Sequence, residues 1–398
     1  MRTILLATVA TLAAGAAGAE QHMEGPVKLG VVLGFTGPLE SLAPTMAAGA
    51  EMAMTEISES GNLLGGMTVE PVRGDSTCID AAAATAAAER LITNDGVAGI
   101  VGADCSGVTG AILSNVAMPN GIVIISPSAT SPGLSDAEDN GLFFRTAPSD
   151  ARQGVIVSEI LAENGIDSVA MTYTNNDYGK GLADSIQANI EEAGGSVTIS
   201  AAHEDGKADY SSEVAALAAA GGDALVVAGY VDQGGSGIVR AALDSGAFDT
   251  FFFPDGMVSA ALTDNFGDEI DGSYGTNPGT DSPGAQTFQD MASEDGLDGT
   301  QPYSAESYDA AALILLAMQA AGSTDPQVYK DSVMDVANAP GEEIMPGELG
   351  RALEILADGG DIDYVGASAI ELIGGGESAG NFRVLSFEGG ELQVDGYR

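Results

Sequence analysis

The chain has 398 residues, of which 58 are acidic and 13 are basic, so its formal net charge at pH 7 is −45. A surface this acidic repels the phosphates of nucleic acids and of anionic lipids, which excludes nucleic-acid and membrane-surface binding as functions. Because 45% of the residues are apolar, the composition is that of a folded protein with an acidic surface, not that of a disordered chain.

The first segment, residues 1–19, has the form of a secretory signal peptide. It combines Arg2 with an apolar run that ends in the small residues Ala-Gly-Ala at 17–19. The mature chain is expected to begin near Glu20, with no cysteine at the cleavage point to carry a lipid. No later apolar run approaches the roughly 18 residues that a membrane span needs. We therefore expect a soluble exported protein without a lipid anchor.

Short apolar runs alternate with helical patterns along the chain. Strands are predicted at 27–35, 67–75, 97–103 and 122–126, with helices at 49–58, 81–92 and 110–118. The pattern restarts with strands at 168–174, 196–202, 224–230 and 251–256, and helices at 181–194, 211–221 and 235–246. This alternation predicts an α/β fold with parallel sheets covered by helices. The two doubly wound series, joined near 145–154 and again near 273–279, indicate two lobes with a cleft between them.

The sequence contains two cysteines, Cys78 and Cys105, and two histidines, His22 and His203. In an oxidising compartment a well-separated cysteine pair favours a disulfide over a metal or redox site, and two buried free thiols are the alternative. So few histidines exclude a histidine-rich zinc site and leave a serine nucleophile almost without a candidate base. We therefore expect no metal and no catalytic residues.

In doubly wound sheets ligands bind beyond the carboxyl ends of the strands, so the turns that follow the predicted strands are the candidate binding loops. They are rich in glycine, hydroxyl groups and acids, and lie at 34–42, 102–107, 126–133, 174–181, 229–235 and 253–260. The alternative is that these turns only connect strands to helices, since such turns commonly have this composition.

The turn GADCSG, residues 102–107, places the hydroxyl of Ser106 and free backbone N–H groups at the start of a predicted helix. Such a position attracts anions without a basic side chain. The Walker pattern with its lysine is absent, which argues against nucleotide phosphate, and there is no G-x-S-x-G elbow for a serine nucleophile. A carboxylate fits this turn best.

In the second series, Asp255 and the aromatic residues Tyr178 and Tyr230 lie at the ends of predicted strands. An acid beside aromatic faces suits an ammonium group, through charge-assisted hydrogen bonding and cation–π attraction. The alternative makes Asp255 a helix cap and the tyrosines packing residues at the rim.

A series of segments then carries a resemblance to a known family. In chain order they are GFTGPLESLAPTMAAGAEMA, DSTCIDAAAA, GADCSG, IISPSATSPGL, FFRTAPSDARQG, NNDYGKGLADS, AGYVDQGG, FPDG and YSAESYDAA. Over about residues 26–395 their order and spacing resemble the branched-chain amino acid (Leu/Ile/Val) receptors, type I periplasmic binding proteins that supply ABC importers. The resemblance implies two Rossmann-like lobes joined by a hinge of three crossings. It also implies a periplasmic location, an ABC permease of the inner membrane as partner, and no cofactor.

The resemblance also implies roles for individual residues. Cys78 and Cys105 are expected to form a disulfide, and the others to bind a small amino acid. The carboxylate of the amino acid is expected to bind to Ser106 and Thr130, and its ammonium group to Asp255 and the backbone carbonyl near Ser128. The residues expected to line the pocket around it are Leu42, Ala129, Tyr178, Tyr230 and Tyr303.

Two positions depart from the pattern of the amino acid receptors. Asp255 stands where a glutamate is usual, and Leu42, followed by Pro44, stands where an aromatic residue is common. Both changes leave the ligand open, because related receptors on this scaffold take amides, urea-like compounds and aromatic acids.

The resemblance also divides the chain into lobes. Lobe 1 is expected at 26–148 with 276–362, and lobe 2 at 149–275 with 363–398, with hinge segments near Pro148, Asn277 and Tyr364. A receptor that must hinge freely is expected to be a monomer. The competing hypotheses are an enzyme on the same two-lobed plan, and a sensory module that passes the ligand state to a receptor.

Overall fold

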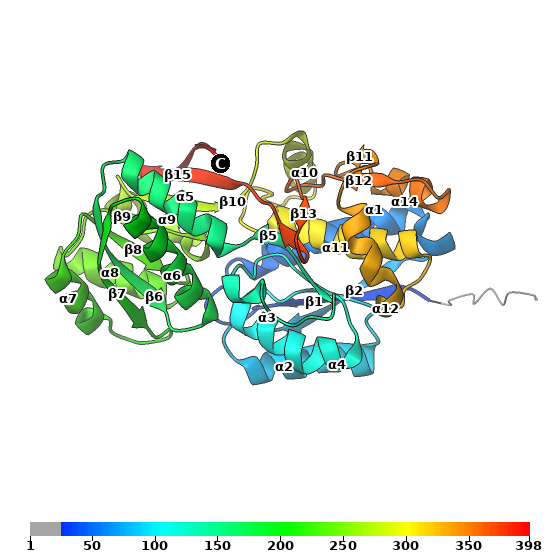
Figure 1. Ribbon diagram of the computed structural model, residues 1–398, viewed down its shortest axis with the longest axis horizontal. Helices are drawn as coiled ribbons and strands as arrows, with labels where there is room; N and C mark the ends of the chain where they lie inside the picture. The colour runs from blue at the N-terminus through cyan, green and yellow to red at the C-terminus, as the bar shows by residue number, and fades with distance from the viewer. Residues whose placement is uncertain (1–24) are drawn as a thin grey trace, which may run out of the picture.

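The computed structural model describes residues 25–398, and the predicted signal peptide lies outside the described residues. The chain forms two α/β lobes that lie end to end along the long axis of the molecule (Figure 1). Each lobe is built on a 7-stranded sheet covered by helices. The predicted fold class and the two-lobed architecture are therefore confirmed.

The sheet of the first lobe is parallel except at one edge. In the spatial order β13-β14-β5-β4-β3-β1-β2, its strands are β1 (Val27–Leu33), β2 (Val69–Asp75), β3 (Ile100–Gly102), β4 (Ile124–Ser126), β5 (Phe143–Pro148), β13 (Leu372–Ile373) and β14 (Glu377–Ser378). Strands β1 to β5 pair in parallel, and β13 and β14 form an antiparallel hairpin whose second strand joins β5. Strands β3 and β4 are buried along their whole length, which explains their uninterrupted apolar sequences.

The first lobe takes helices from both ends of its sequence. They are α1 (Ala43–Ser60), α2 (Ala81–Arg90), α3 (Ser106–Ile112), α4 (Met118–Asn120), α10 (Pro283–Glu294), α11 (Ser304–Ala321), α12 (Pro326–Tyr329), α13 (Val333–Val336) and α14 (Leu349–Ala357). A small parallel sheet of β11 (Glu342–Ile344) and β12 (Ile362–Tyr364) lies beside them. Among the described residues, no helix combines the length and the apolar character that a membrane crossing requires.

The sheet of the second lobe has the spatial order β16-β15-β10-β9-β8-β6-β7. Its strands are β6 (Ser168–Thr174), β7 (Ser196–His203), β8 (Ala224–Ala228), β9 (Phe251–Phe253), β10 (Tyr274–Pro278), β15 (Phe382–Glu388) and β16 (Glu391–Tyr397). Its helices are α5 (Asp150–Glu163), α6 (Asp177–Glu192), α7 (Ser211–Ala220), α8 (Gly234–Ser245) and α9 (Ala260–Phe266). The strands from β6 to β10 pair in parallel, and the C-terminal hairpin β15–β16 adds antiparallel strands at one edge.

The chain passes between the two sheets after β5, after β10 and after β14. The first passage follows Pro148, the last residue of β5. The second begins after Pro278, because Asn277 is a buried residue inside β10 and pairs with β15, so a boundary at 276 divides a strand.

The third passage lies at 379–381, and the predicted position near Tyr364 is wrong. The carboxylate of Asp309, on α11, accepts hydrogen bonds from the Tyr364 hydroxyl (2.7 Å) and from the backbone N–H of Ala367 (2.8 Å) and Ser368 (2.7 Å). These bonds keep the segment after Tyr364 on the first lobe, where β14 pairs with β5 before the chain crosses to the second lobe. The short hairpin β13–β14 offers too few residues for a periodic pattern in the sequence.

Helix α11 forms the centre of the first lobe. The helix runs from Ser304 to Ala321, and every residue from Glu306 to Gln319 is buried, so the helix is enclosed on all sides. Its N-terminal end lies against α1 at Gly49, where a Cβ atom would stand 2.3 Å from the Ser304 carbonyl oxygen. The absence of a side chain at Gly49 therefore permits the close approach of the two helices.

We expect Gly49→Ala to lower the free energy of unfolding by about 1 to 3 kcal/mol, because the added methyl group has no space between α1 and α11. Gly110→Ala, within α3, is the matched control. A Cβ at Gly110 would lie 3.8 Å from its nearest neighbour, the side chain of Leu134, which is an ordinary contact distance. The control should be neutral or slightly stabilising, as alanine favours the helix. Urea denaturation measures the free energy of unfolding of both variants. If the Gly49 variant is as stable as the wild type, α1 and α11 can move apart without loss of stability.

Candidate ligand-binding site

The loops at the carboxyl ends of the strands in both lobes meet at one small cavity. Its volume is about 10 Å³. The lining residues are Leu39, Asp104, Cys105, Ser106, Ser128, Tyr178, Tyr230, Asp255, Gly256 and Tyr303. The structure therefore brings together Ser106, Ser128, Tyr178, Tyr230, Asp255 and Tyr303 among the predicted site residues.

Asp255 is the central group of this cavity and is only 1% exposed. Its carboxylate accepts a hydrogen bond from the Tyr178 hydroxyl at 2.7 Å and a second from the Tyr303 hydroxyl. The Tyr178 hydroxyl also accepts a bond from the backbone N–H of Gly256, at 3.1 Å. The short 3-10 turn Asp255–Met257 has Pro254 at its N-cap and no side-chain cap, so the alternative of Asp255 as a helix cap is wrong.

Three tyrosines surround this carboxylate. Tyr178 and Tyr230 stack with their ring centroids 5.2 Å apart, and the hydroxyl of Tyr230 accepts a hydrogen bond from the Asn176 side chain at 3.3 Å. Tyr303 comes from the other lobe and has a φ of +64°, a left-handed conformation that non-glycine residues seldom adopt. This conformation at the start of α11 is part of what places the Tyr303 hydroxyl on Asp255.

A second buried carboxyl group, Asp150, lies beside Asp255 at the start of α5. The amide of Gln153 lies between the two carboxylates. With its nitrogen toward them it donates to Asp150 at 3.1 Å and to Asp255 at 3.0 Å. Burial raises the pKa of both acids, and repulsion from Asp255 raises the pKa of Asp150 further. Hydrogen bonds from Tyr303 and Tyr178 lower the pKa of Asp255 and offset part of the cost of burial.

The opposite wall carries hydroxyl groups from the first lobe. Ser106, at the start of α3, accepts a hydrogen bond from the backbone N–H of Ser131 at 3.1 Å, so its own proton can be donated to a ligand. The hydroxyl of Ser128 donates to the carbonyl of Asp104 at 3.0 Å. The Asp104 carboxylate is buried and accepts bonds from the backbone N–H of Gly34 (2.8 Å) and from the Ser76 hydroxyl (2.7 Å).

Arg145 holds the loop that carries the hydroxyl groups. This arginine on β5 is fully buried and donates to the carbonyls of Ala129 (3.1 Å) and Ser131 (2.9 Å). It also forms an ion pair of 2.6 Å with Glu377 on β14. The hairpin at the edge of the sheet thus supports the loop through Arg145, which is a positioning residue.

Three predicted site residues, two of the pocket and one of the carboxylate group, do not line the cavity. Leu42 is buried at the start of α1, and Leu39 of the same loop lines the cavity instead. Ala129 is buried, and the hydroxyl of Thr130 is buried without a hydrogen-bond partner among the described residues. Sequence reasoning also missed Asp104 and Asp150, although both stand in motifs that it quoted, GADCSG and RTAPSDARQG.

The two lobes touch each other around the cavity. The backbone N–H of Ser41 donates to the Asp232 carboxylate at 2.8 Å, and the Ser131 hydroxyl donates to the Asp177 carbonyl at 3.0 Å. With the bond from Tyr303 to Asp255, these contacts join the lobes directly across the site.

The predicted disulfide between Cys78 and Cys105 is present, with their Cα atoms 5.1 Å apart. It ties the loop after β2 to the start of α3, beside Ser106. Within residues 25–398, the only cluster of potential metal ligands consists of Asp104 and these two cysteines. Because the sulfur atoms are bonded to each other, no thiolate is available there for a metal. His203 is buried against Thr172 and does not line the cavity.

The site thus consists of buried carboxylates, tyrosine hydroxyls and serine hydroxyls supplied from both lobes, with the cavity between them. This arrangement suits reversible capture of a small polar molecule, and it defines a two-lobed ligand-binding protein. The model of the family described as periplasmic binding protein matches residues 26–341. The chain belongs to this family, as a type I periplasmic binding protein of the branched-chain amino acid group.

Curated relatives agree with this assignment. The chain is 30% identical over 336 residues to Leu/Ile/Val-binding protein homolog 1 of Brucella abortus, covering 82% of this chain and 86% of that protein. It is 28% identical over 310 residues to the leucine-, isoleucine-, valine-, threonine- and alanine-binding protein of Pseudomonas aeruginosa, covering 77% of this chain and 82% of that protein.

Solved structures share the fold. A leucine-binding protein from Thermotoga maritima matches with a TM-score of 0.78 and 22% identity, covering 93% of this chain and 98% of that chain. A solute-binding protein of an ABC transporter from R. palustris, in complex with benzoate, matches with a TM-score of 0.75 and 18% identity, covering 94% and 96%.

We expect Asp150→Asn to raise the stability of the protein at pH 7, because burial and repulsion from Asp255 disfavour the ionised form of this carboxyl. Since the pKa of Asp150 is raised in the folded state, its contribution to stability is full below the ordinary value of 3.8 and is lost as the pH rises through the raised value. The gain in the variant should therefore shrink as the pH falls toward 3.8. Urea denaturation over a pH series measures it, with the exposed Asp136→Asn as control. A gain that does not change with pH would contradict the explanation.

Proposed function

We propose that this protein is the substrate-binding component of an ABC importer and that it captures a small amino acid with an apolar side chain. The observation that carries the proposal is the buried Asp255 carboxylate between the lobes, which faces the serine hydroxyls of the opposite wall. A zwitterion needs both an acid and a set of hydrogen-bond donors, and this cavity offers the two on facing lobes.

In this proposal the two ends of the ligand bind to different lobes. The ammonium group binds to Asp255, against the faces of Tyr178 and Tyr230 and beside the carbonyl of Ser128. The carboxylate binds to Ser106 and the backbone of the loop that Arg145 holds. Thr130 lies in the same loop, and its buried hydroxyl, which has no hydrogen-bond partner in the part of the chain that the structure describes, supplies a further donor for the carboxylate.

The cavity is smaller than any amino acid. With a volume of about 10 Å³, the cavity must widen before any amino acid can enter. The ligand must also replace at least one of the tyrosine hydroxyls that bind Asp255. An ammonium group can do so, because it donates stronger hydrogen bonds to a carboxylate than a neutral hydroxyl does. The relative from Pseudomonas aeruginosa is named for binding leucine, isoleucine, valine, threonine and alanine, which are all small amino acids.

A second candidate is an aromatic or other small acid without an amine. One observation favours it: Asp255 already accepts hydrogen bonds from Tyr178 and Tyr303, so it has no need of an ammonium group. The solved relative with benzoate shows that the shared fold accommodates such an acid. This ligand would use the Ser106 side of the cavity alone.

Delivery to a membrane permease completes the proposed function. The lobes would separate and close about the passages after β5, after β10 and at 379–381. In this proposal the protein is exported to the periplasm, acts as a monomer and catalyses no reaction. A sensory module remains the alternative use of the same ligand-dependent closure.

A ligand screen tests the proposed class. Purified mature protein, unfolded and refolded to remove carried-over ligand, is expected to gain thermal stability only with a narrow set of small apolar amino acids. Amides, urea-like compounds and aromatic acids are the comparison set. Stabilisation by aromatic acids alone would favour the second candidate, and turnover of any compound would identify an enzyme.

Replacing Asp255 with alanine separates the two candidates. Amino acid binding should weaken by about 2 to 4 kcal/mol, because a buried ammonium group loses its charged partner. Isothermal titration calorimetry measures the loss, with Asp249→Ala, an exposed acid of the same lobe, as control. Unchanged affinity in the Asp255 variant would show that the ligand carries no ammonium group at this position.

A further inference from the structure

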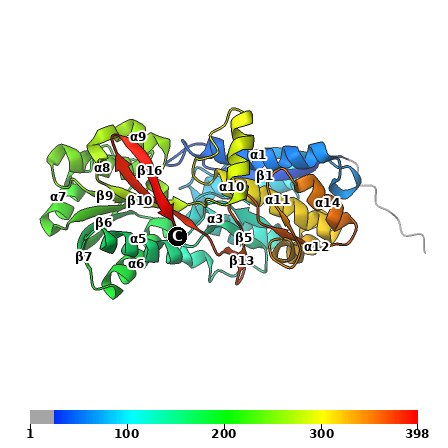
Figure 2. The same cartoon turned by 90° about the horizontal axis from the view of Figure 1, so that it is seen from above.

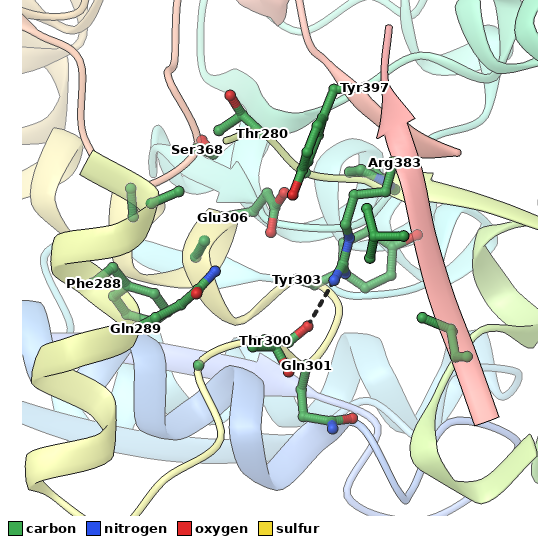
Figure 3. A pocket seen from close by; sticks show the side chains of 18 residues that line it. Thr280, Phe288, Gln289, Thr300, Gln301, Tyr303, Glu306, Ser368, Arg383 and Tyr397 are labelled. Atoms are coloured by element: carbon green, nitrogen blue, oxygen red, sulfur yellow. Dashed lines mark hydrogen bonds between the residues drawn. The ribbon is translucent and has the colours of Figure 1, made fainter. Parts of the chain in front are cut away.

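A second and larger cavity lies on the other side of Tyr303. Its volume is about 390 Å³, and its wall comes from helices α10 and α11 and from the C-terminal hairpin β15–β16 (Figure 3). Figure 2 shows α10, α11 and β16 from above. Tyr303 lines both this cavity and the one around Asp255. The passage after β10 runs beside it, since Gly279 and Thr280 form part of its wall. The passage after β14 is next to that one, because the backbone N–H of Gly279 donates to the Asn381 carbonyl at 3.0 Å.

Arg383 on β15 is the cationic group of this cavity. One guanidinium nitrogen donates to the Thr300 carbonyl at 3.1 Å, and the buried Nε has no hydrogen-bond partner. Among the described residues no carboxylate forms an ion pair with Arg383. The side chain lies against Gly279, where a Cβ would stand 2.9 Å from Nε. A guanidinium with N–H groups left over is costly to bury without an acceptor.

Glu306 on α11 faces the same space as Arg383 and Tyr397 (Figure 3). The residue is 3% exposed, and burial raises the pKa of its carboxyl to about 7. The charged groups that act on it are Arg383 from β15, which lowers its pKa, and Asp309 from its own helix, which raises it. Near neutral pH the carboxyl is therefore partly protonated and can donate a hydrogen bond.

The remaining wall is amphipathic. Polar groups come from Thr280, Gln289, Gln301 and Ser368, and apolar surface comes from Phe288, Leu392 and Val394. An arginine with an unused N–H, a carboxyl that can donate and an apolar wall together match a carboxylate attached to a short apolar group.

We propose that this cavity is a second small-molecule site, which takes a small organic carboxylate and binds its charged end to Arg383. Arg383 and the β16 residues come from the second lobe, whereas Glu306 and Phe288 come from the first. A ligand here contacts both lobes beside two of the chain passages, so its binding depends on how the lobes are placed. Because Tyr303 also bonds to Asp255, the two sites are linked through one side chain.

Butyrate and benzoate, with butyramide and benzamide as uncharged analogues, are suitable probes. Saturation-transfer NMR on the mature protein should detect both acids and neither amide. Arg383→Gln should weaken binding of the acids about tenfold or more, because the charged partner is lost. Arg351→Gln is the matched control, since Arg351 is an exposed arginine of α14, and it should leave binding unchanged. If Ser106→Ala and not Arg383→Gln weakens binding of the acids, they bind between the lobes and the proposal is overturned.

Glu306→Gln provides a second variant in case Arg383→Gln does not fold. Above about pH 7 the variant should bind the acids several-fold more tightly than the wild type, because a negative charge opposite Arg383 is gone, and below that pH the two should agree. Binding of acids and amides alike, equal binding to the Arg383 variant, or no binding to the wild type would each overturn the proposal. The last result would identify the cavity as a space filled by solvent.

Discussion

The burial of the Asp255 carboxylate is the constraint on which the arrangement of the two lobes depends. An ionised carboxylate away from water is costly unless hydrogen-bond donors surround it. Tyr178 supplies one donor from the same lobe, and Tyr303 supplies another from the opposite lobe. Asp255 is fully provided with partners only when the lobes touch. The group that we propose as the binding partner of the ligand therefore also stabilises the contact between the lobes.

The rest of the scaffold serves to keep these partners in place. Tyr303 stands at the start of α11, and the close approach of α11 to α1 at Gly49 determines where that start lies. On the facing wall, Arg145 joins the carbonyls of the hydroxyl-bearing loop to Glu377, at the far edge of the sheet. Buried side chains with several hydrogen bonds each thus define the geometry of a site made of loops.

The position of Tyr303 connects the two proposals. On one side its hydroxyl competes with a ligand for Asp255, and on the other side its ring forms part of the wall that Arg383 and Glu306 share. A molecule in either cavity meets residues of both lobes. In both proposals, ligand capture and the relative placement of the lobes are parts of one equilibrium, which a ligand that prefers the closed arrangement would shift.

The sequence by itself determined the α/β class, the two lobes, the disulfide between Cys78 and Cys105, and the loops that meet around Asp255. These follow from apolar periodicity, from the rule that ligands bind beyond the carboxyl ends of parallel strands, and from the resemblance of short motifs. Tertiary structure alone decided which side chain of a loop reaches the cavity: Leu39 and not Leu42, with Asp150 beside Asp255. It also decided the third passage, because Asp309 holds the segment after Tyr364 on the first lobe. A pattern in the sequence locates a loop, whereas the direction of each side chain depends on contacts with residues far away in the chain.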